Sequence, residues 1–137
     1  MSTFRLAALP EVLRQSPYER LLRLEMVRAA ADGVVVTMPF HNDIVAGDDE
    51  PARYVHGGAI ASLIDIAGTF AVIAATGCDA VTVDLRVDYL RPVKSGDLVA
   101  TARLVRVGRE LGIADVEVVA ADGKIAAVGR GLFKPLR

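Results

Sequence analysis

The sequence predicts an α+β fold in which one long helix packs against an antiparallel sheet of about five to six strands. Residues 56–77 are almost entirely apolar and carry one acidic residue, Asp65. Residues 81–90 alternate apolar and polar side chains, as a half-buried strand does. Two Asp-Gly pairs, at 32–33 and 122–123, lie between apolar runs and favour tight hairpin turns.

Length and composition set the class of protein. The 137 residues are enough for a single domain, 1–137, with a substantial core. Hydrophobic residues make up 53%, which is above the usual share and suggests further burial in an oligomer. A net charge of −1 gives no basic field for nucleic acid. One cysteine, Cys78, excludes an intramolecular disulfide, and we expect a reducing, cytoplasmic location.

The sequence predicts neither a signal peptide nor a membrane-spanning segment. The N-terminal residues contain no long apolar run of the kind found in a signal peptide. Residues 57–78 are nearly long enough to cross a bilayer, but Asp65 near the middle would be costly there and amphipathic strands follow directly. We therefore expect a buried helix of a soluble protein and no membrane partner.

The order of elements is two strands, a long helix and four strands. Residues 1–22 form an N-terminal arm, where Pro10 and Pro17 suit the first turns of two short helices that cover the core or part of a substrate tunnel. The core occupies 23–135, and 41–55 is predicted as a loop leading into His56. The expected strands are 23–31, 34–40, 81–90, 98–107, 111–120 and 124–134.

The long helix has two faces of different character. One side carries apolar residues at helical spacing, namely Ile60, Leu63, Ala67, Phe70, Ala71 and Ala74. Asp65 lies nearly opposite, on the same face as Gly58, Ser62 and Thr69. A solvent-exposed face would normally carry several charged residues, so we expect a second subunit to cover this one.

This arrangement, opened by His56-Gly57-Gly58, resembles the hotdog fold and, more closely, the PaaI-type acyl-CoA thioesterases. The resemblance covers about residues 23–135. That family places an acid nine residues after the histidine, which here is Asp65. The remaining matches are Thr69 one turn later, Thr82 in Thr-Val-Asp, Tyr89 and Pro92 in Y-x-x-P, and the turn Gly108-Arg109.

The resemblance implies an enzyme that hydrolyses an acyl-CoA thioester to a free acid and coenzyme A. It also implies a homodimer or homotetramer with a composite site at the dimer interface, and we expect neither a cofactor nor a metal. One position departs from the family. Many relatives carry an asparagine six residues before the histidine, where this chain has Glu50. We therefore expect either that this loop supplies a different group or that the site is altered.

The chemistry can also be argued from the residues. The first N–H groups of a helix lack internal partners and lie at the positive end of its dipole, so the Gly57 N–H is a natural oxyanion donor. A side chain at Gly57 would block the thioester carbonyl. Asp65 is the candidate general base or nucleophile. Thr69 and Thr82 are candidates to assist it, and His56 is expected to anchor the loop rather than act as a base.

Substrate contacts are predicted at both ends of the coenzyme A ester. Gly58 and Glu50 flank the helix mouth and are candidate substrate-binding residues. Lys94 and Arg109, the latter in a turn with Gly108, suit coenzyme A phosphates because exposed Lys and Arg bind such groups well. Packing at Gly58 and solvation of the two cations are the simpler explanations for the same residues.

Other chemistries fit the sequence less well. A Ser62–His56–Asp65 triad lacks the G-x-S-x-G turn, and His41, His56 and Cys78 lack zinc-site spacing. No P-loop or G-x-G-x-x-G stretch is present. Two alternatives stay open: a non-catalytic domain that binds or senses acyl-CoA, and a hotdog hydratase. Asp65 discriminates against the binding module, which has no need of a carboxylate there.

Overall fold

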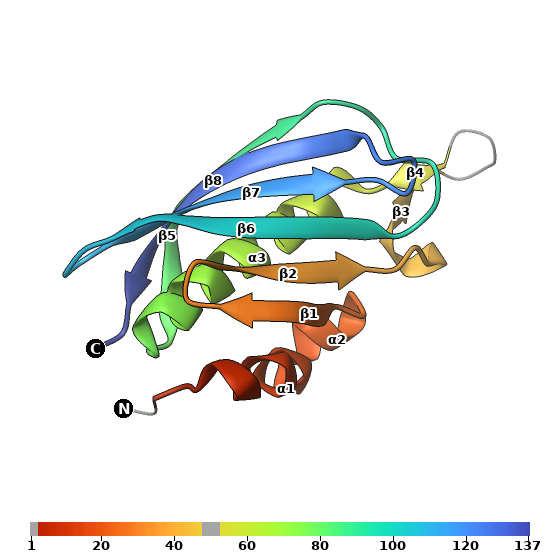
Figure 1. Cartoon of the computed structure of the whole chain (residues 1–137). Coiled ribbons are helices and arrows are strands. Elements are labelled where there is room, and N and C mark those ends of the chain that lie inside the picture. Colours follow the sequence, from red (N-terminus) through yellow and green to blue (C-terminus); the bar gives the residue numbers. More distant parts are fainter. Residues whose placement is uncertain (1–2, 48–52) are drawn as a thin grey trace.

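The computed structural model describes residues 3–47 and 53–137. Figure 1 shows one curved sheet with a long helix, α3, running across it. The helices are η1 (Leu6–Ala8), α1 (Leu9–Gln15), α2 (Pro17–Leu21), η2 (Asn42–Ile44) and α3 (Gly57–Thr76). The strands are β1 (Glu25–Ala30), β2 (Gly33–Met38), β3 (Val45–Ala46), β4 (Tyr54–Val55), β5 (Ala80–Tyr89), β6 (Leu98–Val107), β7 (Gly112–Val119) and β8 (Ile125–Pro135).

The main sheet has six antiparallel strands in the order β1-β2-β6-β7-β8-β5. The predicted fold class, a long helix on an antiparallel sheet of five to six strands, is confirmed. Strand β5 follows α3 in the chain yet pairs with the last strand, β8, and therefore forms one edge of the sheet. This position brings the end of β5 close to the start of α3.

The loop predicted at 41–55 has more structure than the sequence indicated. It contains the short helix η2 and a two-residue ladder in which Val45 pairs with Val55 and Ala46 with Tyr54. Strands this short carry no alternation pattern, so the sequence gives no sign of them. The ladder anchors both ends of the loop just before α3 begins.

The N-terminal arm forms the two short helices that its prolines predict. Pro10 lies in the first turn of α1 and Pro17 begins α2. Both positions suit proline because the first turn leaves its N–H groups without intrahelical acceptors. Leu9 and Leu13 of α1 are at most 1% exposed, so the arm packs against the core through this apolar side.

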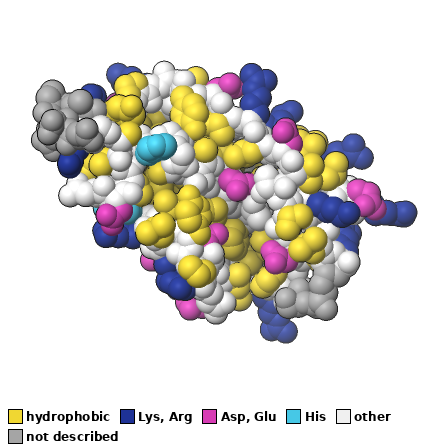
Figure 2. Space-filling view, turned by 180° about the vertical axis from the view of Figure 1, so that it is seen from behind, with side chains coloured by type: hydrophobic (Ala, Val, Ile, Leu, Met, Phe, Trp, Pro, Cys, Tyr) yellow, Lys and Arg dark blue, Asp and Glu magenta, His cyan; other side chains and the backbone are white. Residues whose placement is uncertain are grey.

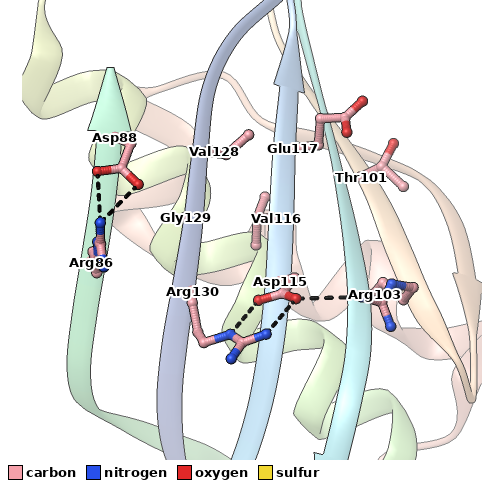
Figure 3. Close-up of a pocket in the computed structure, with 10 residues that line it drawn as sticks. All are labelled: Arg86, Asp88, Thr101, Arg103, Asp115, Val116, Glu117, Val128, Gly129 and Arg130. Carbon is pink, nitrogen blue, oxygen red and sulfur yellow. Dashed lines mark hydrogen bonds and ion pairs between the residues drawn. The ribbon is translucent and has the colours of Figure 1, made fainter. Parts of the chain in front are cut away.

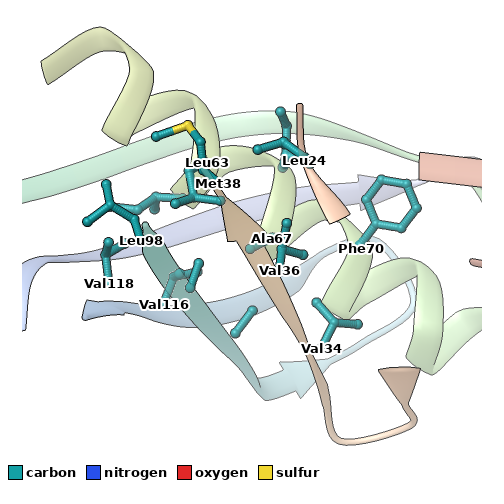
Figure 4. Packing of buried hydrophobic residues seen from close by; sticks show 14 of the residues in the cluster. Leu24, Val34, Val36, Met38, Leu63, Ala67, Phe70, Leu98, Val116 and Val118 are labelled. Atoms are coloured by element: carbon teal, nitrogen blue, oxygen red, sulfur yellow. The ribbon is translucent and has the colours of Figure 1, made fainter. Parts of the chain in front are cut away.

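Helix α3 packs closely on the inner face of the sheet (Figure 4). The residues of its predicted apolar stripe are all buried except Ala74, which is partly buried. Small residues on both surfaces permit the close approach. A Cβ on Gly68 would lie 2.6 Å from Cζ of the buried Phe133, and one on Gly129 would lie 2.7 Å from Cγ2 of Ile64. These glycines are therefore needed for packing.

The burial of α3 also accounts for its apolar composition. By length and composition alone the helix could cross a membrane, and the core helix of a soluble protein meets the same criterion. Sixty-one per cent of the apolar segment is buried within the protein. The helix ends at Gly77, whose positive φ of 72° suits glycine and whose N–H donates to the Ile73 carbonyl at 2.7 Å.

The outer face of the sheet is polar and has a hollow of about 760 Å³ (Figure 3). Asp115 accepts hydrogen bonds from Arg130 at 2.6 and 2.9 Å and pairs with Arg103 at 3.4 Å, while Arg86 pairs with Asp88. The bonds from Arg130 hold the pKa of Asp115 below its ordinary value. The three arginines that line the hollow thus each pair with an aspartate.

Candidate active site

His56 caps the N-terminus of α3. Its Nδ1 accepts a hydrogen bond from the Gly58 N–H at 2.8 Å, and its own N–H donates to the Ile44 carbonyl at 2.7 Å. The imidazole therefore satisfies one of the free N–H groups of the first turn. This geometry agrees with the anchoring role predicted for His56.

The Gly57 N–H is left free by this cap. No acceptor bonds it within residues 3–47 and 53–137. Gly57 and Gly58 lie in the wall of a cavity of about 480 Å³ at the mouth of the helix. The other lining residues are Tyr54, Val55, Ile60, Tyr89, Leu90, Arg91, Pro92 and Val93. A free N–H at a helix mouth beside an apolar cavity can stabilise a developing oxyanion.

Tyr89 forms part of this cavity wall. Its hydroxyl donates to the Gly57 carbonyl at 2.7 Å, and its ring lies 3.4 Å from the position that a Cβ on Gly57 would take. The loop that follows Tyr89 is bonded to the rest of the protein, because Val93 accepts a hydrogen bond from the Val55 N–H at 2.8 Å. The cavity is therefore built from three elements, β4, α3 and the end of β5.

Asp65 lies two turns further along α3 and is partly buried. The Thr82 hydroxyl donates to its Oδ1 at 2.6 Å, which places Thr82 on the carboxylate as the sequence suggested. Thr69 behaves differently. Its hydroxyl donates to the Asp65 main-chain carbonyl at 2.8 Å and not to the carboxylate. This is the usual bond of a helical threonine to the carbonyl four residues earlier.

The basic residues predicted to bind phosphate lie at opposite ends of the sheet. Lys94 follows the cavity residues in the loop between β5 and β6. Gly108 and Arg109 lie in the β6–β7 turn, near Gly112, which packs against Val72 in the C-terminal half of α3. Val72 is fifteen residues from Gly57, or about 22 Å along the helix. Arg109 is thus far from the cavity of its own chain.

Glu50, a predicted substrate-binding residue, lies outside the described residues. Arg91, which the sequence did not single out, lines the cavity, and its Nη1 lies 3.2 Å from Oδ2 of Asp122. Its charge is therefore paired at the edge of an otherwise largely apolar wall.

Asp65 and the Gly57 N–H are separated along one helix. Eight residues at 1.5 Å each place them about 12 Å apart. Reacting groups must approach to roughly 3–3.5 Å. The two groups of one chain therefore cannot act on the same carbonyl.

Strand β5, which carries Thr82 beside Asp65, forms an edge of the sheet and exposes several apolar side chains. Val81 and Val83 of β5 are 47% and 56% exposed, and Leu90 just beyond the strand is 57% exposed. Figure 2, seen from behind, shows hydrophobic side chains gathered over the molecule with acidic groups set singly among them. An exposed edge strand that carries apolar side chains is a surface with which another strand can pair.

Comparison with known proteins identifies the family. Residues 53–127, which contain α3 and the cavity wall, match the thioesterase superfamily. The chain belongs to the thioesterase superfamily. It is 39% identical over 125 residues to a protein of Halobacterium salinarum with a provisional esterase name, covering 81% of this chain and 80% of the relative. It is 32% identical to human acyl-coenzyme A thioesterase 13, covering 82% and 81%.

A solved structure supports the same fold. The Escherichia coli PaaI protein of the phenylacetic acid degradation operon superposes with a TM-score of 0.83 at 26% identity, covering 96% of this chain and 92% of that one. The predicted PaaI-type hotdog resemblance is confirmed, and the protein is a thioester hydrolase.

Sequence reasoning missed the cavity wall of this thioesterase-superfamily protein. Tyr54, Leu90 and Arg91 belong to no motif, and Tyr89 belongs only to Y-x-x-P. The one available signal was the exposed apolar pair Tyr89-Leu90 at the end of an alternating strand, where a turn residue would be more usual.

Proposed function

We propose that the protein hydrolyses acyl-CoA thioesters to a free acid and coenzyme A at a site shared by two subunits. The observation that carries this proposal is the free Gly57 N–H beside an apolar cavity at the mouth of α3. The substrate class is supported by relatives named acyl-CoA thioesterases in human and Escherichia coli. The single cysteine, Cys78, is free and supports a reducing compartment such as the cytoplasm.

The proposed chemistry uses one donor and one carboxylate. The thioester carbonyl oxygen accepts the Gly57 N–H, and charge that develops on this oxygen is stabilised there. Asp65 removes a proton from a water molecule that attacks the carbonyl carbon, or attacks the carbon itself to give a mixed anhydride that water then hydrolyses. In both routes the C–S bond breaks, the thiolate of coenzyme A leaves and takes a proton, and the acid is released.

The composite site follows from the separation of the two groups. Because the Gly57 N–H and Asp65 of one chain lie about 12 Å apart, we assign the carboxylate to the partner subunit. The exposed edge of β5 supports this assignment, since Thr82 on that strand holds the Asp65 carboxylate. Pairing two β5 edges around a two-fold axis would place both active sites along the junction.

The test is thiol release from short, medium, long and aryl acyl-CoAs by the wild type and Asp65→Asn. The amide keeps the shape of the carboxylate but is neither a base nor a nucleophile. We expect kcat to fall by about 10²–10⁴, the usual value of general-base catalysis. Asp32→Asn, an exposed hairpin carboxylate paired with Arg28, is the matched control and should retain activity.

The outcomes separate this proposal from its alternatives. If the wild type binds acyl-CoAs and hydrolyses none of them, the protein is a binding module. If it adds water to an enoyl-CoA without releasing thiol, it is a hydratase. If Asp65→Asn hydrolyses as fast as the wild type, the assigned role of Asp65 is wrong.

A further inference from the structure

Helix α3 begins with two consecutive glycines, Gly57 and Gly58. Glycine in a helix costs roughly 0.5–1 kcal/mol relative to alanine because it has more conformational freedom to lose. A helix end made of two glycines therefore tends to fray. An oxyanion donor, however, is effective only when its direction is held in advance.

Side chains from three directions restrain this pair. His56 Nδ1 accepts from the Gly58 N–H at 2.8 Å, and the Tyr89 hydroxyl donates to the Gly57 carbonyl at 2.7 Å. The Ser62 hydroxyl donates to the Gly58 carbonyl at 2.8 Å. Among the N–H and C=O groups of the two glycines, the Gly57 N–H is the one that receives no side-chain bond from the described parts of the chain.

The bond from Tyr89 connects the glycines to the sheet. Tyr89 is the last residue of β5 and is paired in register with Ala127 of β8. The next two N–H groups, of Leu90 and Arg91, both donate to the Ala126 carbonyl, at 2.9 and 3.3 Å. The backbone that carries the tyrosine is thus fixed on both sides, although the residue itself is 52% exposed.

The bond from Ser62 is supported from the N-terminal arm. Tyr18 of α2 lies with its hydroxyl 2.7 Å from the Ser62 Oγ. Because the serine proton is used on the Gly58 carbonyl, the Tyr18 hydroxyl is the donor in this pair. These two hydrogen bonds give the N-terminal arm a polar connection to the start of α3 in addition to its apolar packing.

We propose that Tyr89 is a positioning residue that holds the Gly57 N–H in the direction needed by the reacting carbonyl, with the Tyr18–Ser62 pair as a second restraint. The inference rests on the proposed function, in which Gly57 is the oxyanion donor. It adds a role for two tyrosines and a serine that touch no reacting atom.

The test compares Tyr89→Phe with the wild type. Phenylalanine keeps the ring in the cavity wall and removes only the hydrogen bond to Gly57. We expect kcat to fall by about three- to tenfold, the equivalent of one ordinary hydrogen bond, with KM little changed. The amide order parameter of Gly57, measured by NMR, should fall from about 0.85 toward 0.6. Ser62→Ala should act in the same direction.

Thr76→Val is the matched control. The Thr76 hydroxyl donates to the Val72 carbonyl at 2.9 Å, so this change also removes a hydroxyl bond to a carbonyl of α3. It lies about 28 Å from Gly57 along the helix. We expect Thr76→Val to lower the melting temperature and to leave kcat unchanged. If a general loss of stability explained the effect of Tyr89→Phe, Thr76→Val would lower kcat as well.

Two results would decide against parts of the argument. An unchanged kcat in both Tyr89→Phe and Ser62→Ala overturns the positioning role, whatever the order parameters show. A wild type that releases no thiol, together with a lower Gly57 order parameter in Tyr89→Phe, rejects the thioesterase mechanism but supports the restraint of the glycine pair.

Discussion

Replacing Gly57 by alanine should leave the fold intact while removing activity. The backbone of Gly57 is outside the positive-φ region that requires glycine. The added Cβ would lie 3.4 Å from Cε1 and Cζ of Tyr89 and 3.5 Å from its hydroxyl, which is ordinary van der Waals contact. Alanine also has less freedom to lose in a helix, by up to about 1 kcal/mol. We expect the melting temperature to be unchanged or to rise by about 1–3 °C.

The loss of activity follows from where the methyl group would stand. Gly57 and Tyr89 both line the cavity, so a methyl between them occupies space beside the free N–H. The thioester carbonyl would then be unable to reach its donor. Removing one oxyanion donor typically lowers kcat by about 10²–10³. The assay is thiol release under saturating acyl-CoA, with unfolding followed in parallel by differential scanning fluorimetry.

Gly68→Ala provides the opposite case on the same helix. Its Cβ would lie 2.6 Å from Cζ of Phe133, which is fully buried, so the packing around it would have to shift. Inserting one methyl into a well-packed core typically costs 1–3 kcal/mol, so this variant should melt several degrees lower. Two results for Gly57→Ala would contradict these predictions. A wild-type kcat would refute the role given to the Gly57 N–H, and a large fall in the melting temperature of Gly57→Ala would refute the expectation that the methyl group fits.

Two further predictions concern the partner subunit and coenzyme A. Val83→Lys, which places a charge on the exposed β5 edge, should weaken the dimer in light scattering at micromolar concentration, and a stable wild-type monomer of 14.5 kDa would contradict the shared site. Arg109→Ala should raise KM several-fold with kcat little changed, because phosphate contacts are equal in the ground and transition states. An unchanged KM at low salt would remove Arg109 from the site. Lys94, beside the cavity, would then be tested by the same measurement.

The sequence predicts local structure in this protein better than it predicts contacts. Helix α3 and the six long strands follow from periodicity and from Asp-Gly turns, which depend on neighbouring residues alone. The bond between Tyr89 and Gly57 joins residues 32 apart and depends on β5 pairing with β8. Strand order is not encoded in alternation, because an alternating strand fits beside any partner that buries the same face.

The site shows the same division. The spacing of His56, Gly57 and Asp65 could be read from the sequence. The Thr82 bond to the Asp65 carboxylate involves the residue suggested by the family resemblance. The partner of the Thr69 hydroxyl could not be read from the sequence, because a threonine hydroxyl in a helix can bond either a backbone carbonyl of its own helix or a group outside it. Tyr54 lies in the β3–β4 ladder, which was not predicted within the loop 41–55, and Arg91 lies in the connection between β5 and β6.

The proposed shared site constrains how two subunits could pair. When two copies of one helix lie side by side and antiparallel around a two-fold axis, facing residue numbers add to a constant. Gly57 can face Asp65 of the partner only if that axis passes near position 61. The residue there is Ala61, and its neighbours on the same face, Gly58 and Ser62, are also small. In the proposed dimer the two helices would therefore meet on this stripe of small side chains, and Asp65, four residues beyond Ala61, would face the partner's Gly57.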